Sequence, residues 1–254
     1  MQAAARRFLV PGDPPVGFEG GVSAETRRLF EEGVVVSLIK PEGWTSFEVV
    51  EKVRSVVGVR KVGHAGTLDP FATGVLVVAI GRATKRISEL MGLEKEYEGI
   101  IEFGLETDTL DPTGAVVRTC AVPEIRLDQL AEAAKQFVGE IEQRPPVYSA
   151  LKVRGKRLYK LARAGRPVEL PPRKVFVKRF DILEWQPPLA KFRVECHAGT
   201  YVRALARDLG AAVGSCGYVR QLCRTRVGPY TLENSLTIEE FAERARSGGW
   251  LQRE

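Results

Sequence analysis

The chain has 254 residues, which is enough to bury a large core as one domain with an insertion or as two smaller domains. Its hydrophobic fraction of 44% is ordinary for a globular protein, and no apolar run approaches the roughly 18 residues that a membrane span needs. The first residues lack the sustained apolar stretch of a secretory signal, so the sequence predicts a cytoplasmic protein.

The four cysteines and two histidines show no spacing typical of a metal site. Because the cysteines also lack a CxxC pair, they are predicted to be reduced thiols. These are Cys120, Cys196, Cys216 and Cys223. The sequence therefore predicts no metal and no cofactor.

The net charge of +6 hides a strong asymmetry along the chain. Residues 144–179 hold twelve Lys and Arg side chains and one acidic residue, Glu169, whereas the rest of the chain is mildly acidic. A one-sided basic segment is typical of a surface that binds a polyanion, although a charge run can also be a solvated face. The candidate contacts to an RNA backbone in this segment are Lys152, Arg154, Lys156 and Arg157.

Residues 1–33 are predicted to be a flexible N-terminal extension outside the core, because Pro and Gly interrupt any period before a short helix at 25–32. Val34–Ile39 is typical of a strand, and Lys40 follows it. The spacing alone favours an ordinary exposed lysine there. Thr45 and Glu48 have the spacing of a capping box, and valines then recur at helical spacing.

The segment 61–74 combines three glycines, His64 and the step Asp69-Pro70 without a helical or strand period. Pro70 keeps the preceding residue out of the α region, so the loop holds the Asp69 carboxylate in a fixed extended or turn geometry. Asp before Pro is also common turn chemistry. Val75–Ile80 follows as a buried strand, which places Asp69 at the end of a core strand.

Further along the chain, the pattern predicts a helix over 82–91 and an alternating strand over 97–103. Tyr97 falls on the buried face of that strand, where it is either a core tyrosine or a ring on which a base stacks. The acidic residues of the strand, among them Glu98, fall on the polar face. Residues 107–114 are predicted to be a turn rather than a cation site.

The C-terminal half predicts a helix over 127–138, a strand pair over 173–185 and 189–197, a basic strand over 217–227 and a closing helix over 237–246. His197 falls on a polar face. Tyr201 and Arg203 lie in the first turn of a helix that opens at 199–203, where backbone donors converge.

The pattern Gly-His-Ala-Gly-Thr-Leu-Asp-Pro-x-Ala-Thr-Gly at 63–74 resembles the catalytic motif of the TruB family of tRNA pseudouridine synthases. The resemblance runs from about Val34 to Glu239. It also rests on Lys40-Pro41, Tyr97, the turn 107–114, Tyr148-Ser-Ala-Leu-Lys152 and Gly199–Arg203. It implies an α+β pseudouridine synthase fold, a central and mostly antiparallel mixed sheet with a cleft, and the conversion of uridine 55 in the T-arm of tRNA to pseudouridine.

The resemblance also implies roles for single residues. Asp69 is the nucleophile and Arg203 its ion-pair partner. His64 enters the space vacated by flipped nucleotides, Tyr97 stacks on the target base, and Tyr201 lies beside it. Leu222 lines the pocket, and Lys40 and Lys85 match positions near the RNA. We expect one catalytic domain over 34–254 that includes the basic insertion, and a monomer.

The sequence after the closing helix offers no segment for the PUA-type RNA-binding domain that many bacterial relatives carry. Alternative functions are a tRNA-binding or tRNA-folding module with incidental catalysis, a synthase within a guide-RNA particle, and a metal-dependent nuclease. The missing PUA domain weakens the second alternative, and the absence of a ligand cluster weakens the third.

Overall fold

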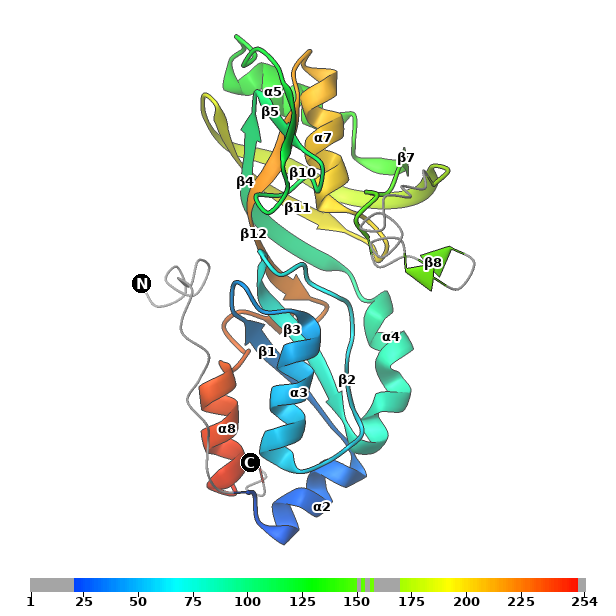
Figure 1. Cartoon of the computed structure of the whole chain (residues 1–254), viewed down its shortest axis with the longest axis vertical. Helices are drawn as coiled ribbons and strands as arrows, with labels where there is room; N and C mark the ends of the chain where they lie inside the picture. The colour runs from blue at the N-terminus through cyan, green and yellow to red at the C-terminus, as the bar shows by residue number, and fades with distance from the viewer. Residues whose placement is uncertain (1–20, 150–151, 154–155, 158–169, 251–254) are drawn as a thin grey trace. The chain divides into compact units, whose positions relative to one another are not determined.

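The computed structural model describes residues 21–149, 152–153, 156–157 and 170–250. The chain forms two compact units (Figure 1). The first unit runs to Lys95 and resumes at Cys223, and the second unit is Glu96–Leu222. The short helix predicted at 25–32 of the N-terminal extension is present as α2 (Ala24–Gly33). Phe30 is fully buried within the first unit.

The first unit is built on a small sheet in which β3 is the central strand. β3 (Thr73–Ile80) pairs antiparallel with β1 (Val34–Lys40) and with β2 (Val62–His64). It pairs in parallel with β12 (Gly217–Val227) at Cys223 and Arg224. The remaining elements of this unit are α3 (Ser46–Val57), the 3-10 helix η1 (Gly81–Arg86), α4 (Ile87–Gly92), β13 (Tyr230–Thr231) and α8 (Ile238–Arg246).

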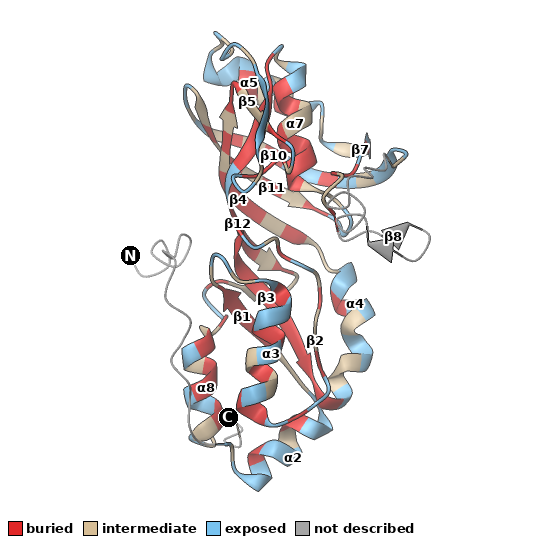
Figure 2. Ribbon diagram, viewed as in Figure 1, coloured by how far each residue is buried: buried red, intermediate tan, exposed pale blue. Residues whose placement is uncertain are grey.

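Every residue of β3 is buried, as Figure 2 shows, because both faces of the strand are covered. Even-numbered residues such as Leu76 and Val78 pack with α2, α3 and α8. Odd-numbered residues such as Val75 and Val77 pack with Leu90 of α4. The predicted capping box is also confirmed, since Thr45 caps α3 and Glu48 returns a hydrogen bond to the cap backbone.

The second unit holds a sheet in the strand order β12-β4-β11-β10-β7. Its strands are β4 (Lys95–Phe103), β7 (Gly139–Gln143), β10 (Arg173–Gln186) and β11 (Leu189–Cys196), and its helices are α5 (Leu127–Lys135) and α7 (Val202–Ala212). Two hairpins lie apart from this sheet: β5 (Leu105–Thr107) with β6 (Val116–Thr119), and β8 (Lys152–Val153) with β9 (Lys156–Arg157). Parallel and antiparallel pairs together confirm the predicted α+β class with a mixed sheet.

Two local predictions are wrong, and a third is confirmed only in part. The segment 61–74 is not loop throughout, because Val62–His64 adds to β3 as β2. The helix predicted over 82–91 begins as the 3-10 helix η1 and becomes α-helical only at Ile87. Glu98 is not on a solvated face, since it is 2% exposed and accepts hydrogen bonds from the guanidinium of Arg193 at 2.6 and 3.0 Å.

The prediction of reduced cysteines is also wrong for one pair. Cys120 and Cys216 form a disulfide with Cα atoms 5.8 Å apart, across a sequence separation of 96 residues. Such a pairing has no local sequence signal because the fold alone brings the two positions together. Cys196 and Cys223 are buried. No helix of the described residues is long and apolar enough to cross a membrane.

Candidate active site

Asp69 lies in the loop that joins β2 to β3 in the first unit. The loop turns at Asp69-Pro70, where the Ala72 N–H donates to the Asp69 carbonyl at 3.1 Å. The carbonyl of Pro70 accepts from the Gly43 N–H at 2.8 Å. At the end of the loop, Gly74 has a φ of +104°, and a Cβ there would lie 2.2 Å from the Arg224 backbone oxygen. Only glycine permits this conformation and this approach to β12.

Lys40 holds the loop through a hydrogen bond to the Pro70 carbonyl and is fully buried. Its ammonium donates to the carbonyls of Trp44 at 2.6 Å, Pro41 at 2.8 Å and Pro70 at 3.2 Å. Burial lowers the pKa of Lys40 from 10.5 to about 7, against the attraction of the Asp69 carboxylate and with the repulsion of Arg224. Lys40 is therefore not the exposed lysine that its spacing favours, because three carbonyls converge on its ammonium group.

Arg224 holds the loop at both of its ends and is 1% exposed. Its guanidinium donates to the Val75 carbonyl at 2.7 Å, to Gly66 at 3.1 Å and to Thr67 at 3.5 Å. A planar guanidinium with five N–H donors suits such a fan of carbonyls. Arg224 thus fixes the backbone on the two sides of Asp69.

Ser46, the first residue of α3, ties that helix to the residue before Asp69. Its hydroxyl accepts from the Leu68 N–H at 2.9 Å and donates to the Leu68 carbonyl at 3.2 Å. Ser46 is 2% exposed. Ser46, Lys40 and Arg224 therefore give the backbone of the Asp69 loop hydrogen-bond partners both before and after Asp69.

The other site residues predicted in the first unit are less enclosed. His64 is half-buried at the end of β2, where it lies opposite Val78 of β3. Lys85 is exposed on η1. Their predicted contacts with RNA stay predictions.

Arg203 lies in the first turn of α7 in the second unit and is 4% exposed. Its guanidinium donates to the Thr109 carbonyl at 2.6 Å, to the Tyr148 carbonyl at 3.0 Å and to the Asp111 carboxylate at 3.2 Å. Asp111 is itself 5% exposed, so this is a buried ion pair. The predicted pairing of Arg203 with Asp69 stays a prediction.

Asp111 organises the turn that carries it. Its second carboxylate oxygen accepts from the hydroxyls of Thr113 at 2.6 Å and Thr109 at 2.7 Å, and from the Thr113 N–H at 3.0 Å. This is the predicted Asx turn chemistry. The other carboxylate oxygen of Asp111 accepts a hydrogen bond from Arg203. The same turn therefore also sets the position of Arg203, which is a predicted site residue.

Tyr201 is the N-cap residue of α7, and the side chain of Gln143 holds its backbone. The Tyr201 N–H donates to Gln143 Oε1 at 2.8 Å, and Gln143 Nε2 donates to the Tyr201 carbonyl at 3.1 Å. Tyr97 of β4 is 9% exposed, as its strand period predicts, and Leu222 of β12 is 7% exposed. Their roles at a base stay predictions.

Three of the predicted RNA-backbone residues, Lys152, Lys156 and Arg157, belong to the β8–β9 hairpin. Lys152 pairs with Arg157 in the register, and Lys156 with Val153. Arg154 and residues 158–169 of the basic segment lie outside the described residues. Within the described ranges, no group of three or more His, Cys, Asp or Glu side chains is placed to hold a metal ion.

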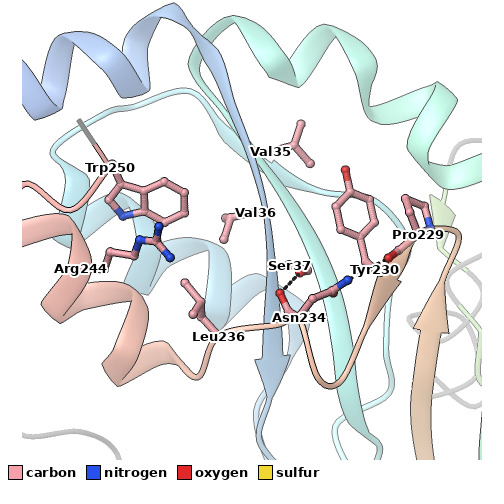
Figure 3. A pocket seen from close by; sticks show the side chains of 9 residues that line it. All are labelled: Val35, Val36, Ser37, Pro229, Tyr230, Asn234, Leu236, Arg244 and Trp250. Carbon is pink, nitrogen blue, oxygen red and sulfur yellow. Dashed lines mark hydrogen bonds between the residues drawn. The ribbon is translucent and has the colours of Figure 1, made fainter. Parts of the chain in front are cut away.

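A pocket of about 390 Å³ lies at the edge of β1 in the first unit (Figure 3). Tyr230 and Trp250 line it from opposite ends of the view, and Ser37 donates a hydrogen bond to the Asn234 carbonyl at its lower rim. None of its lining residues is a predicted site residue.

A family model described as "TruB family pseudouridylate synthase (N terminal domain)" matches residues 54–202. A second, "tRNA pseudouridylate synthase B C-terminal domain", matches residues 203–250. The chain belongs to the TruB family. The first match holds the Asp69 loop, and the two matches meet between Val202 and Arg203. The predicted family and enzyme class, a pseudouridine synthase and hence an isomerase, are confirmed.

Curated TruB relatives match most of the chain. The tRNA pseudouridine synthase B of Caldanaerobacter subterraneus subsp. tengcongensis is 48% identical over 210 residues, which cover 82% of this chain and 74% of that protein. The protein of the same name from Phocaeicola vulgatus is 46% identical over 220 residues, which cover 84% of this chain and 94% of that one.

Solved structures confirm the predicted pseudouridine synthase fold. A Cbf5-Nop10-Gar1 complex has a TM-score of 0.67 at 28% identity, covering 96% of this chain and 68% of that chain. An H/ACA RNP bound to a substrate RNA containing 2′-deoxyuridine has a TM-score of 0.65 at 28% identity, covering 89% of this chain. This chain spans 58% of the length of that second structure's chain.

Sequence reasoning missed two residues that bond the Asp69 loop in the first unit, Ser46 and Arg224. It also missed two in the second unit, Asp111 and Gln143, which bond Arg203 and Tyr201. Arg224 lies on a strand whose alternation leaves its face undecided, and its burial depends on the carbonyls of a loop more than 140 residues away. Gln143 carries no charge or periodic signal. Asp111 had a signal, since it repeats the Asp-Pro step of the Asp69 loop, but that step is also ordinary turn chemistry.

Proposed function

We propose that this chain isomerises uridine 55 in the T-loop of tRNA to pseudouridine, as a cytoplasmic monomer, with Asp69 as the nucleophile. The names of its relatives support tRNA as the substrate. The observation that carries the proposal is the Asp69 loop, whose backbone is fixed by Lys40, Ser46 and Arg224. A rigid loop that presents one carboxylate suits covalent catalysis, which needs a pre-positioned nucleophile.

The reaction breaks the bond between uracil N1 and ribose C1′, turns the base, and joins C5 to C1′. C5 loses a proton and N1 gains one, so the product is an isomer of the substrate. No redox change and no external acceptor are involved. The Asp69 carboxylate attacks the ribose or the base and holds the intermediate together while the base turns. Arg203 balances the charge of this carboxylate. Tyr201, beside the target base, helps to remove the C5 proton.

The target base is stacked in a folded T-loop and is flipped out at a cost of roughly a few kcal/mol. Tyr97 stacks on the flipped base, Leu222 lines its pocket, and His64 enters the vacated space. The exposed Lys85 lies toward the RNA, whereas the buried Lys40 acts through the Pro70 carbonyl, which it holds next to Asp69. The basic segment, with Lys152, Arg154, Lys156 and Arg157, contacts phosphates, which need cations on one face rather than particular identities.

The test is tritium release from a tRNA transcript labelled at uracil C5, with wild type and Asp69→Asn. The wild type should release label from one T-loop uridine at a rate that a chelator leaves unchanged, and Asp69→Asn should release none. Asp128→Asn is the matched control, because Asp128 is an exposed carboxylate on α5. Tight binding without release by the wild type would instead support a tRNA-binding or tRNA-folding module.

A further inference from the structure

Gln143 uses both polar groups of its amide on the backbone of one residue, Tyr201. The two hydrogen bonds measure 2.8 and 3.1 Å, and Gln143 is 1% exposed. Because the Gln143 side chain is buried, its amide has no ready substitute partner if one of these bonds is lost. The side chain therefore satisfies both the N–H and the carbonyl of Tyr201, as the backbone of a neighbouring β-strand would.

Tyr201 needs such a partner because it begins α7 without a side-chain cap. Its carbonyl also accepts the first N–H bonds of the helix, from Ala204 at 3.1 Å and Leu205 at 3.2 Å. Its own N–H lies outside the helix and is satisfied by Gln143. The two hydrogen bonds from Gln143 hold the Tyr201 backbone, and the backbone in turn sets the direction of the Tyr201 side chain.

Gln143 is also the last residue of β7, directly before the basic segment 144–179. Two further contacts join the start of that segment to α7. Arg207 Nη2 donates to the Arg144 carbonyl at 3.0 Å, and Arg203 Nη2 donates to the Tyr148 carbonyl at 3.0 Å. Arg203 and Arg207 are four residues apart and share one face of the helix. Residues 143–148 are thus attached to α7 at three points.

We propose that Gln143 is a positioning residue for Tyr201 and links it to the start of the basic segment. The inference rests on the proposed function, in which Tyr201 lies beside the target base and the basic segment holds the RNA. A base that must turn within its pocket is sensitive to the placement of its neighbours, since a shift of about 1 Å can cost roughly a hundredfold in rate.

The experiment compares wild type with Gln143→Ala and Gln143→Glu, and uses Gln136→Ala as the control because Gln136 is an exposed glutamine in the same unit. The first readout is hydrogen exchange of the Tyr201 amide, which needs no activity. Gln143→Ala should speed this exchange about tenfold or more while the amides in the middle of α7 stay protected. Gln143→Glu keeps an acceptor for the N–H, so its Tyr201 amide should stay protected.

The second readout is the single-turnover rate of tritium release at saturating tRNA transcript. Gln143→Ala should lower it by about tenfold to a hundredfold, with the Kd for the transcript changed less than about threefold. Gln143→Glu, which folds with the same shape but lacks the donor to the Tyr201 carbonyl, should fall between Gln143→Ala and wild type. Gln136→Ala should match wild type in both readouts.

Unchanged amide exchange in Gln143→Ala would overturn the inference, as would a loss confined to the Kd. A wild type that releases no tritium would refute the proposed function and the catalytic part of this inference with it. Amide exchange would still decide whether Gln143 holds Tyr201, so the two failures are distinguishable.

Discussion

Among the described residues, each unit of the molecule buries one arginine against a loop or turn, and the two arginines differ in what balances their charge. Arg224 of the first unit donates to three carbonyls, and among the described residues no carboxylate forms an ion pair with it. Arg203 of the second unit donates to two carbonyls and to the carboxylate of Asp111. The first arrangement fixes a backbone, and the second fixes a backbone and also neutralises a charge.

The difference shows how each unit tolerates a buried cation. The second unit supplies an anion from the turn that carries Asp111. The first unit places a second cation, Lys40, near Arg224, and the repulsion between them contributes to the lowered pKa of the lysine. A buried charge costs several kcal/mol unless it is paired or gives up its proton. The second unit pairs its buried arginine with an anion, whereas in the first unit three carbonyls surround Arg224 and the lowered pKa of Lys40 relieves the second charge.

Removal of the anion in the second unit should have the largest effect. Asp111→Ala leaves Arg203 buried without that carboxylate and also breaks the turn, so we expect the free energy of unfolding to fall by about 3–5 kcal/mol. Denaturant titration would measure it, with Asp108→Ala as the control. The exposed Asp108 accepts one hydrogen bond from the Ala115 N–H, so its loss should cost only about 1 kcal/mol. Equal losses would show that Arg203 does not need the Asp111 charge.

In the first unit, a substitution that keeps the positive charge at position 224 tests whether the geometry of the arginine, rather than its charge, holds the Asp69 loop. Arg224→Lys retains a cation but replaces the planar fork with one ammonium, which cannot reach carbonyls at both ends of the Asp69 loop. We expect a loss of about 2–3 kcal/mol in stability and a lower rate of tritium release. Arg226→Lys, two residues along the same strand, should change little. A fully stable Arg224→Lys would mean that charge, rather than geometry, holds the loop.

The hydroxyl of Ser46 offers a smaller change at the same loop. Ser46→Ala removes two hydrogen bonds and leaves the Leu68 N–H buried without its partner, which should cost about 1–2 kcal/mol. The rate of tritium release should also fall, because Leu68 directly precedes Asp69. Ser55→Ala is the control, since Ser55 is exposed on the same helix and bonds only to the Lys52 carbonyl among the described residues. A rate equal to that of Ser55→Ala would place Ser46 outside the positioning of Asp69.

The same comparison separates what the sequence predicts from what it does not. Local signals are sufficient for α3 and β3, because the capping box and the apolar run depend on neighbours in the chain. They also single out Asp69, which sits in a long, specific motif. They do not predict that Arg224 is buried, because its carbonyl partners are distant in sequence. Nor do they predict the burial of Lys40, because the chain must turn after β1 and bring Pro70 close before three carbonyls surround its ammonium group. The Cys120–Cys216 disulfide is missed for the same reason.

The pH dependence of stability should report the state of Lys40. Folded Lys40 releases its proton near pH 7, whereas an unfolded lysine releases it near 10.5. Between these values the unfolded chain binds more protons, so this group makes the free energy of unfolding rise with pH, by at most about 1.4 kcal/mol per pH unit. Below pH 7 the buried ammonium is present in full and its cost is greatest.

Lys40→Met removes this titration while it fills much of the same volume. The difference in unfolding free energy between pH 7.5 and 8.5 should therefore be about 1 kcal/mol more positive in wild type than in Lys40→Met, and denaturant titrations at the two pH values would measure it. Lys52→Met, on the half-exposed part of α3, controls for loss of an ordinary lysine. Parallel pH profiles for wild type and Lys40→Met would mean that the Asp69 attraction outweighs burial and that Lys40 stays charged.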